Sequence, residues 1–144
     1  MRQAGIYKRL KDYFLCPISE STEGAPICSE PYVRVPIDSN EEIGKTVCSV
    51  LDASTIGIPH PSNWDVLVKP FIRLANVKSF RQFERNAHYC QIDDDDVTLS
   101  ITAWRRIEGG GFEMTDENPI VLASGSSFLE ITEALERAFA LCKD

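Results

Sequence analysis

Two places in the chain combine residue types that could carry out catalysis, and both involve a histidine. His60 stands between Pro59 and Pro61, where an imidazole could serve as a general base. His88 and Cys90 lie two residues apart in a segment of alternating polarity, so on a β-strand both side chains would point to one face, as in a Cys/His nucleophile pair or half of a metal site. No nucleophile motif or third group accompanies either place. The sequence therefore assigns no catalytic residue. A small cytosolic enzyme that uses His60, or His88 with Cys90, is the alternative to a protein that acts by binding alone.

Carboxylates are concentrated in two other short segments. The first is the run Asp93, Asp94, Asp95 and Asp96; the second contains Glu113, Asp116 and Glu117. Close like charges repel one another by about a few tenths to one kcal/mol per pair, and folding does not require them. The Asp run does not fit an EF-hand, because Thr98 stands where the sixth-position glycine belongs. We therefore expect a hairpin tip that is either simply solvated or docks basic side chains of a partner.

Neither a cofactor site nor a metal site is expected. The Gly109 to Gly111 run is not a phosphate-binding loop, because no Lys and Ser/Thr follow it and the next charged residues are acidic. The five cysteines are odd in number and include no C-x-x-C pair, which favours reduced thiols in the cytoplasm. No apolar segment reaches the length of a signal peptide core or of a membrane span. We expect a cytoplasmic protein that does not interact with membranes.

The charge of the chain is unevenly distributed. The formal net charge is −7. Residues 1 to 85 hold 11 Lys/Arg and 10 Asp/Glu, net +1, whereas residues 86 to 144 hold 4 and 12, net −8. A field of that sign repels nucleic acid and attracts basic partners, with a strength that falls as salt rises. Plain solubility is the competing explanation for this acidity.

The order of the expected elements predicts an α+β fold. At 144 residues we expect a single domain, with a central, mostly antiparallel sheet of about five strands packed with helices. The expected strands are 13–16, 32–35, 89–92, 97–104 and 120–122, and the short turn 93–96 makes one pairing antiparallel. The segment 18–31 is rich in Ser, Glu, Gly and Pro, and we expect it to be an exposed loop. We expect Phe112 and Met114 to be peripheral core residues.

Two helices are predicted from capping-box spacing. Ser39 with Glu42, and Ser127 with Glu130, each place a hydroxyl and a carboxylate three residues apart. The first helix has an apolar stripe, and its Gly44 suits close packing against the sheet. Around Pro70 we expect two short helices or one kinked helix, followed by a short helix over 79–84. The stripe of the last helix is the set Phe128, Ile131, Ala134, Leu135, Ala138, Phe139, Leu141 and Cys142.

Three segments together resemble a known protein family. They are IPHPSNWDVLVKPFIRLANVKSF (58–80), the strand pair around Asp93 to Asp96, and GGGFEMTDENPIVLASGSSFLEITEALERAFALC (109–142). Their order and spacing are similar to those of the immunity proteins of bacterial contact-dependent growth inhibition (CDI) systems. The likeness spans roughly residues 54 to 142 and contains no catalytic signature, and the N-terminal third matches nothing in it.

The resemblance implies a small cytoplasmic protein that binds the C-terminal toxin domain of a cognate exported effector, without catalysis of its own. Toxins of such systems are often nucleases with basic clefts, so the resemblance implies a basic nuclease partner and a 1:1 heterodimer with an otherwise monomeric chain. The family has no residue-level binding motif to transfer. On electrostatic grounds the toxin-binding candidates are Asp93, Asp94, Asp95, Asp96, Glu113, Asp116 and Glu117. A structural or oligomeric subunit is the third possibility.

Overall fold

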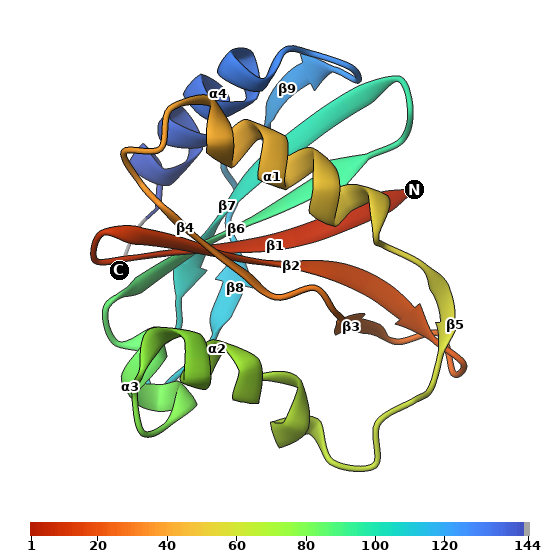
Figure 1. Ribbon diagram of the computed structural model, residues 1–144, viewed down its shortest axis with the longest axis vertical. Helices are drawn as coiled ribbons and strands as arrows, with labels where there is room; N and C mark the ends of the chain where they lie inside the picture. Colours follow the sequence, from red (N-terminus) through yellow and green to blue (C-terminus); the bar gives the residue numbers. More distant parts are fainter. Residues whose placement is uncertain (143–144) are drawn as a thin grey trace.

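A mixed sheet is the centre of the molecule, and helices cover both of its faces (Figure 1). The computed structural model describes residues 1–142. The strands are β1 (Arg2–Arg9), β2 (Asp12–Ser21), β3 (Pro26–Cys28), β4 (Val33–Pro36), β5 (Ile56–Ile58), β6 (Ala87–Asp94), β7 (Thr98–Arg106), β8 (Phe112–Met114) and β9 (Ile120–Ala123). The helices are α1 (Glu41–Asp52), α2 (Lys69–Ala75), α3 (Phe80–Glu84) and α4 (Phe128–Ala140), with a 3-10 turn, η1 (Trp64–Leu67).

The sheet has the order β3-β2-β1-β6-β7-β8. Strands β4 and β5 also pair with β2, and β9 pairs with β7 beside β8. Every pairing is antiparallel except that of β2 with β5. The α+β prediction is therefore confirmed, but within residues 1–142 the sheet has nine strands, so the prediction of about five was too small.

Each face of the sheet has its own apolar core. The larger core lies under α1 and α4, and the smaller one lies under α2 and α3. Strand β2 supplies both, because successive side chains point to opposite faces: Tyr13 and Leu15 join the larger core, while Phe14 and Cys16 join the smaller. This two-sided burial explains why residues 13–16 form a continuous apolar run.

Half of the segment 18–31 lies in strands and is not an exposed loop. Strand β2 continues to Ser21, and β3 returns alongside it. Ser19, Ser21 and Ile27 are buried, and the hydroxyls of Ser19 and Ser29 hydrogen-bond at 2.8 Å. The polar composition misled the prediction because these hydroxyls bond one another and the backbone instead of water.

The two capping-box predictions had different outcomes. At α4 the box is complete: the Ser127 hydroxyl accepts the Glu130 N–H, and the Glu130 carboxylate accepts the Ser127 N–H, each at 3.1 Å. At α1 the N-cap is Asn40, which makes no side-chain capping bond, and the Ser39 hydroxyl is buried without a hydrogen-bond partner in the described structure. The helix of residues 41–52 forms without the predicted box.

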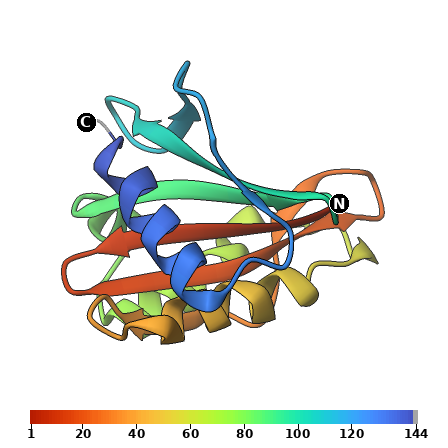
Figure 2. The ribbon, with the colours of Figure 1, turned by 90° about the horizontal axis from the view of Figure 1, so that it is seen from above.

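The two long helices pack against each other through a glycine. A Cβ added at Gly44 of α1 would stand 2.1 Å from the backbone oxygen of Phe128. The glycine therefore allows close packing against α4, whereas we had predicted close packing against the sheet. Seen from above, α4 crosses the strands obliquely, with its first turn beside α1 (Figure 2). Most of the predicted α4 stripe is buried, but Phe128 and Leu141 at its two ends are exposed.

The segment after α1 is irregular, as Pro70 predicted. Two short pieces, η1 and α2, replace one helix, and the Asn63 side chain caps the first by accepting the Asp65 N–H at 3.0 Å. Ser79 caps α3 in the same way. Phe71 and Phe83 anchor α2 and α3 in the smaller core, around the ring of Tyr7. Among residues 1–142, no helix is long and apolar enough to cross a membrane.

Candidate functional site

The four consecutive aspartates do not form one turn. Asp93 and Asp94 are the last residues of β6, and only Asp95 and Asp96 lie in the connection to β7. Asp94 points inward: its carboxylate bonds the Arg2 guanidinium, accepts the Ser124 hydroxyl at 3.0 Å and accepts the Asp96 N–H at 2.9 Å. Its side chain is only 4% exposed, so in this conformation Asp94 cannot contact a partner.

The other three aspartates differ in their hydrogen bonds and in their exposure to solvent. Asp93 accepts a hydrogen bond from the Gln3 side-chain amide at 2.7 Å. Asp95 accepts the N–H groups of Val97 and Thr98, and these bonds lower the pKa of its carboxyl group. Asp96 is 87% exposed and lies 3.8 Å from the Arg2 guanidinium. The charge that this turn presents to solvent therefore belongs to Asp95 and Asp96.

The second acidic segment lies along the outer edge of the sheet. Glu113, on β8, forms an ion pair with Arg105 of β7, and the exposed Asp116 and the half-buried Glu117 lie in the loop before β9. Met114 beside them is 67% exposed, which contradicts its predicted place in the core. Phe112 does pack as predicted, against the rings of Tyr7 and Tyr89.

The two acidic segments stand at opposite ends of β7. Thr98 begins the strand at the Asp95 turn, and Arg105, which pairs with Glu113, lies seven residues later. At roughly 3.3 Å per residue this separation is about 23 Å. One standard protein interface, with about 800 Å² on each partner, can cover both segments, but a single small pocket cannot.

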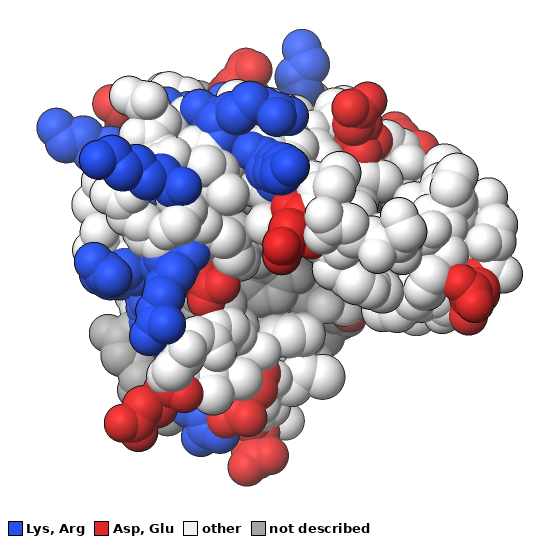
Figure 3. Space-filling model, turned by 90° about the horizontal axis from the view of Figure 1, so that it is seen from below, with Lys and Arg blue, Asp and Glu red and all other residues white. Residues whose placement is uncertain are grey.

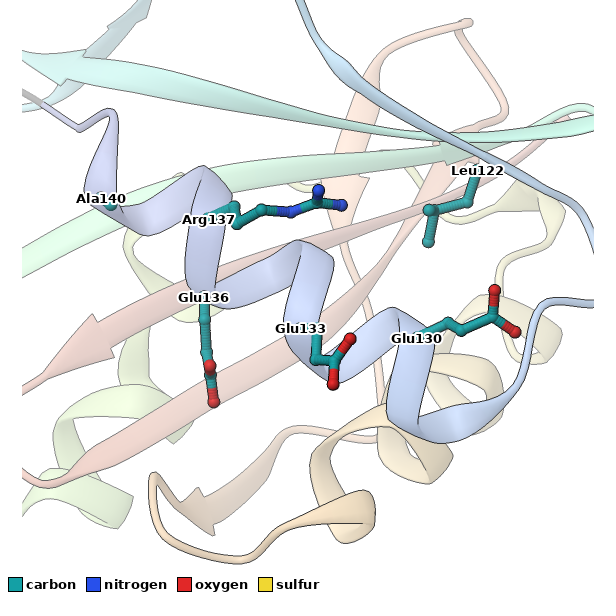
Figure 4. A pocket seen from close by; sticks show the side chains of 6 residues that line it. All are labelled: Leu122, Glu130, Glu133, Glu136, Arg137 and Ala140. Atoms are coloured by element: carbon teal, nitrogen blue, oxygen red, sulfur yellow. The ribbon is translucent and has the colours of Figure 1, made fainter.

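A third acidic group, which sequence reasoning had not included among the binding residues, lies on α4. Glu130, Glu133 and Glu136 project from successive turns of the helix, and Arg137 extends in the direction of Leu122 of β9 (Figure 4). Together they border a shallow groove of about 490 Å³, lined by Leu122, Glu130, Glu133, Glu136, Arg137 and Ala140. The spacing of the glutamates, three residues apart on a wet helix face, is the sequence signal that could have found them.

The candidate histidine His60 has a structural position. Its Nδ1 is 2.8 Å from the Ser21 hydroxyl, its Nε2 is 3.3 Å from the Glu23 carboxylate, and its ring meets Trp64 edge-on. The Ser21 oxygen is buried and already accepts the N–H groups of Glu23 and Ala25, each at 3.2 Å. With those bonds in place the Ser21 hydroxyl is poorly suited to attack a substrate. The contacts of His60 with Ser21 and Glu23 instead hold the segment after β5 against the β2–β3 turn.

Cys90 is buried in the larger core, with its sulfur 3.8 Å from the sulfur of Cys142. Burial raises the pKa of the Cys90 thiol, which disfavours the thiolate that a nucleophile needs. His88, half-buried, pairs across the sheet with Lys8. Within residues 1–142, no three His, Cys, Asp or Glu side chains are grouped so as to hold a metal ion.

Comparison with known proteins decides the family. The model of the CDI immunity protein family matches residues 31–142. The chain belongs to the CDI immunity protein family. The match extends further toward the N-terminus than the resemblance read from the sequence, and it takes in β4 and α1. No curated protein matches this immunity protein.

Two solved structures share the fold of the immunity protein. A protein of unknown function from Neisseria meningitidis has a TM-score of 0.81 and 20% identity, with 98% of this chain and 94% of that chain covered. A chain of the CdiA-CT/CdiI toxin and immunity complex from Yersinia pseudotuberculosis has a TM-score of 0.81 and 16% identity, with 99% and 97% covered. The likeness covers β1 to β3 as well, so the N-terminal third belongs to the common fold.

Proposed function

We propose that this immunity protein binds and neutralises the C-terminal toxin domain of a cognate CDI effector. Membership of the family carries the proposal, and the likeness to a chain of a toxin and immunity complex supports it. The partner we propose is a basic nuclease domain, bound 1:1 in the cytoplasm. An acidic protein can cover a cleft built for phosphodiesters without performing any chemistry of its own.

The proposed docking surface consists of three acidic groups. They are the turn group (Asp95 and Asp96), the edge group (Glu113, Asp116 and Glu117) and the helix group (Glu130, Glu133 and Glu136). Strand β9 contacts α4 and follows the loop of the edge group, so these two groups flank one strand. Of the initial candidates, Asp94 is left out because its side chain is buried, and Asp93 because it is only partly exposed and accepts a hydrogen bond from Gln3.

The test measures association kinetics with the toxin domain encoded next to this chain. Three double variants each remove two negative charges from one group: Asp95→Asn with Asp96→Asn, Glu113→Gln with Asp116→Asn, and Glu133→Gln with Glu136→Gln. A group inside the interface should lower the association rate constant about threefold to tenfold at low salt and flatten its salt dependence. The matched control, Glu20→Gln with Glu30→Gln, removes two exposed carboxylates near β2 and β3 and should change neither.

Two results would contradict different parts of the proposal. If the unmodified pair forms no complex, toxin binding is wrong for this chain. If the complex forms but all three variants associate as fast as the control, binding stands and acidic docking is wrong. Native mass spectrometry of the same mixture checks the 1:1 ratio. A growth assay, in which cells that produce the toxin survive only with the chain, checks neutralisation.

A further inference from the structure

The helices on the other face of the sheet present an unpaired set of basic side chains. The set, called the basic face below, consists of Lys69, Arg73, Lys78, Arg81 and Arg85. All five are exposed, and none forms an ion pair within residues 1–142. Arg2, Arg34 and Arg105, by contrast, each bind a carboxylate. Figure 3 shows Lys and Arg gathered on one side of the molecule as it is seen from the α2 and α3 side.

Folding explains only part of these charges, because the helix dipole favours Arg73 and Arg81 in the last turns of α2 and α3 but disfavours Lys69 at the start of α2. Lys69 and Arg73, and likewise Arg81 and Arg85, are four residues apart, a spacing at which like charges destabilise a helix by about 0.2–0.5 kcal/mol per pair. The helices are anchored instead by Phe71 and Phe83, on their buried side. A solvated surface would tolerate mixed charges equally well, yet Glu84 is the one carboxylate between residues 69 and 85.

The net charge of −7 does not decide the potential at this face. The glutamates of α1 and α4 lie beyond the sheet, on its opposite side. Packed layers are roughly 10 Å apart, so the two helical layers are separated by about 20 Å. The Debye length at physiological salt is about 8 Å, and charges at that separation are largely screened. The whole-chain charge predicts repulsion of nucleic acid, but the local field of the basic face has the opposite sign.

A small cleft borders the basic face. It lies between α3 and the β7–β8 hairpin and has a volume of about 180 Å³, and its charged lining residues are Arg81, Arg85 and Arg106 with Glu84 and Glu108. The Arg106 guanidinium is fixed by hydrogen bonds to the carbonyls of Glu84 and Ala87. The Glu84 carboxylate is held by the Gly111 N–H at 2.6 Å. Because Arg106 is engaged in this way, Arg81 and Arg85 are the cations that the cleft offers to a phosphate group.

An exposed aromatic residue precedes the basic face directly. Trp64 is the first residue of η1, the turn before α2; it is 51% exposed, and η1 buries none of its residues. Its position is set by the edge-on contact with His60. Proteins that bind single-stranded nucleic acid without sequence preference combine basic side chains along the path of the phosphate backbone with aromatic rings on which bases stack.

We propose that the basic face, with Trp64 at its end, binds single-stranded nucleic acid through its phosphate backbone. The five cations contact phosphates, the cleft beside α3 admits one of them, and Trp64 stacks on a base. This activity belongs to the immunity protein alone. It does not depend on the toxin, so its failure would leave the proposed toxin binding untouched.

The test is fluorescence anisotropy of a labelled 12-nucleotide poly(U) with the full chain from 25 to 200 mM salt. Five phosphate contacts predict a slope of log K against log salt of about −3.5, hence an affinity loss of about a hundredfold between 50 and 200 mM. Arg81→Gln with Arg85→Gln, and Lys69→Gln with Arg73→Gln, should each make the slope shallower by about 1.4. Trp64→Ala should weaken binding with the slope unchanged, and Trp64→Phe should restore it.

The matched control is Glu133→Gln with Glu136→Gln, which removes two charges from the opposite face and should leave binding unchanged. Absence of binding at 25 mM salt, or equal affinity in the Arg81/Arg85 variant, would overturn the proposal. Equal competition by polyglutamate of similar length would also overturn it, because the face would then suit an acidic protein. An unchanged affinity in Trp64→Ala would overturn the assignment to single strands. All substituted residues are exposed, and urea unfolding of each variant verifies that it is folded.

Discussion

At the scale of single residues, neighbouring aspartates have opposite roles. Asp94 is enclosed by Arg2, Ser124 and the Asp96 backbone, whereas the Asp96 side chain is almost fully solvated. Replacing all four aspartates at once would therefore mix loss of stability with loss of binding. The turn group has to be tested through Asp95 and Asp96 alone.

Asp94→Asn should destabilise the protein by about 2 kcal/mol, because it removes the buried carboxylate that pairs with Arg2 and leaves that guanidinium with only the exposed Asp52 and Asp96. Asp96→Asn, its isosteric control two residues away, should change stability by no more than about 0.5 kcal/mol. Urea unfolding at constant m-value measures both. Equal effects of the two substitutions would show that Asp94 is as solvated as Asp96.

Cys142 is predicted to be more reactive than Cys90, although their sulfurs are in contact. The contact with the Cys90 thiol lowers the pKa of Cys142, while burial raises the pKa of Cys90. The Cys142 thiolate is therefore more populated near neutral pH than that of an ordinary thiol, and iodoacetamide at pH 7 should alkylate Cys142 about tenfold faster than Cys90 or more. Peptide mapping by mass spectrometry reads both rates.

A control variant tests the cause of that reactivity. Cys90→Ala removes the neighbouring thiol, so the pKa of Cys142 should rise and its alkylation at pH 7 should slow. Faster alkylation of Cys90 than of Cys142 would contradict both the burial of Cys90 and the lowered pKa of Cys142.

At the scale of elements, one sequence motif has two different structural meanings. The pattern Ser-x-x-Glu occurs at the start of α1 and of α4, but only Ser127 caps its helix. Ser127→Ala should cost about 1 kcal/mol of stability. Ser39→Ala should be neutral or slightly stabilising, because the Ser39 hydroxyl is buried without a partner in the described structure. Urea unfolding measures the stability of the two variants. Equal losses of stability would mean that Ser39 caps α1 as Ser127 caps α4.

The elements that were predicted correctly are those whose pattern is local. The strand 120–122, the α4 capping box and the break at Pro70 all follow from spacing within about ten residues. Strand β1 was not predicted, although it is central and pairs with both β2 and β6. Its Ala4, Gly5 and Lys8 are poor strand residues individually, and it is stable because neighbours on both sides satisfy its backbone.

At the scale of the whole molecule, the sheet separates two charged surfaces. The glutamates of α1 and α4 lie on one side, and the basic face of α2 and α3 lies on the other. The net charge of the whole chain sums the two surfaces and therefore does not show that they have opposite signs. We therefore propose two partners of opposite charge for one small protein, one on each side, and the variants of one face serve as controls for the other.

The sequence alone determined the fold class, the helices with local caps and the acidic character of the last two-fifths of the chain, and its resemblance to the CDI immunity proteins was confirmed. These properties depend on periodicity and composition, which can be recognised within short segments of the sequence. Only the tertiary structure decided which carboxylates face solvent, because Arg2 reaches Asp94 from a strand 92 residues away. It also placed the α4 glutamates beside a groove and the basic residues on the opposite face. Burial and charge separation depend on pairings between distant segments, which no local pattern encodes.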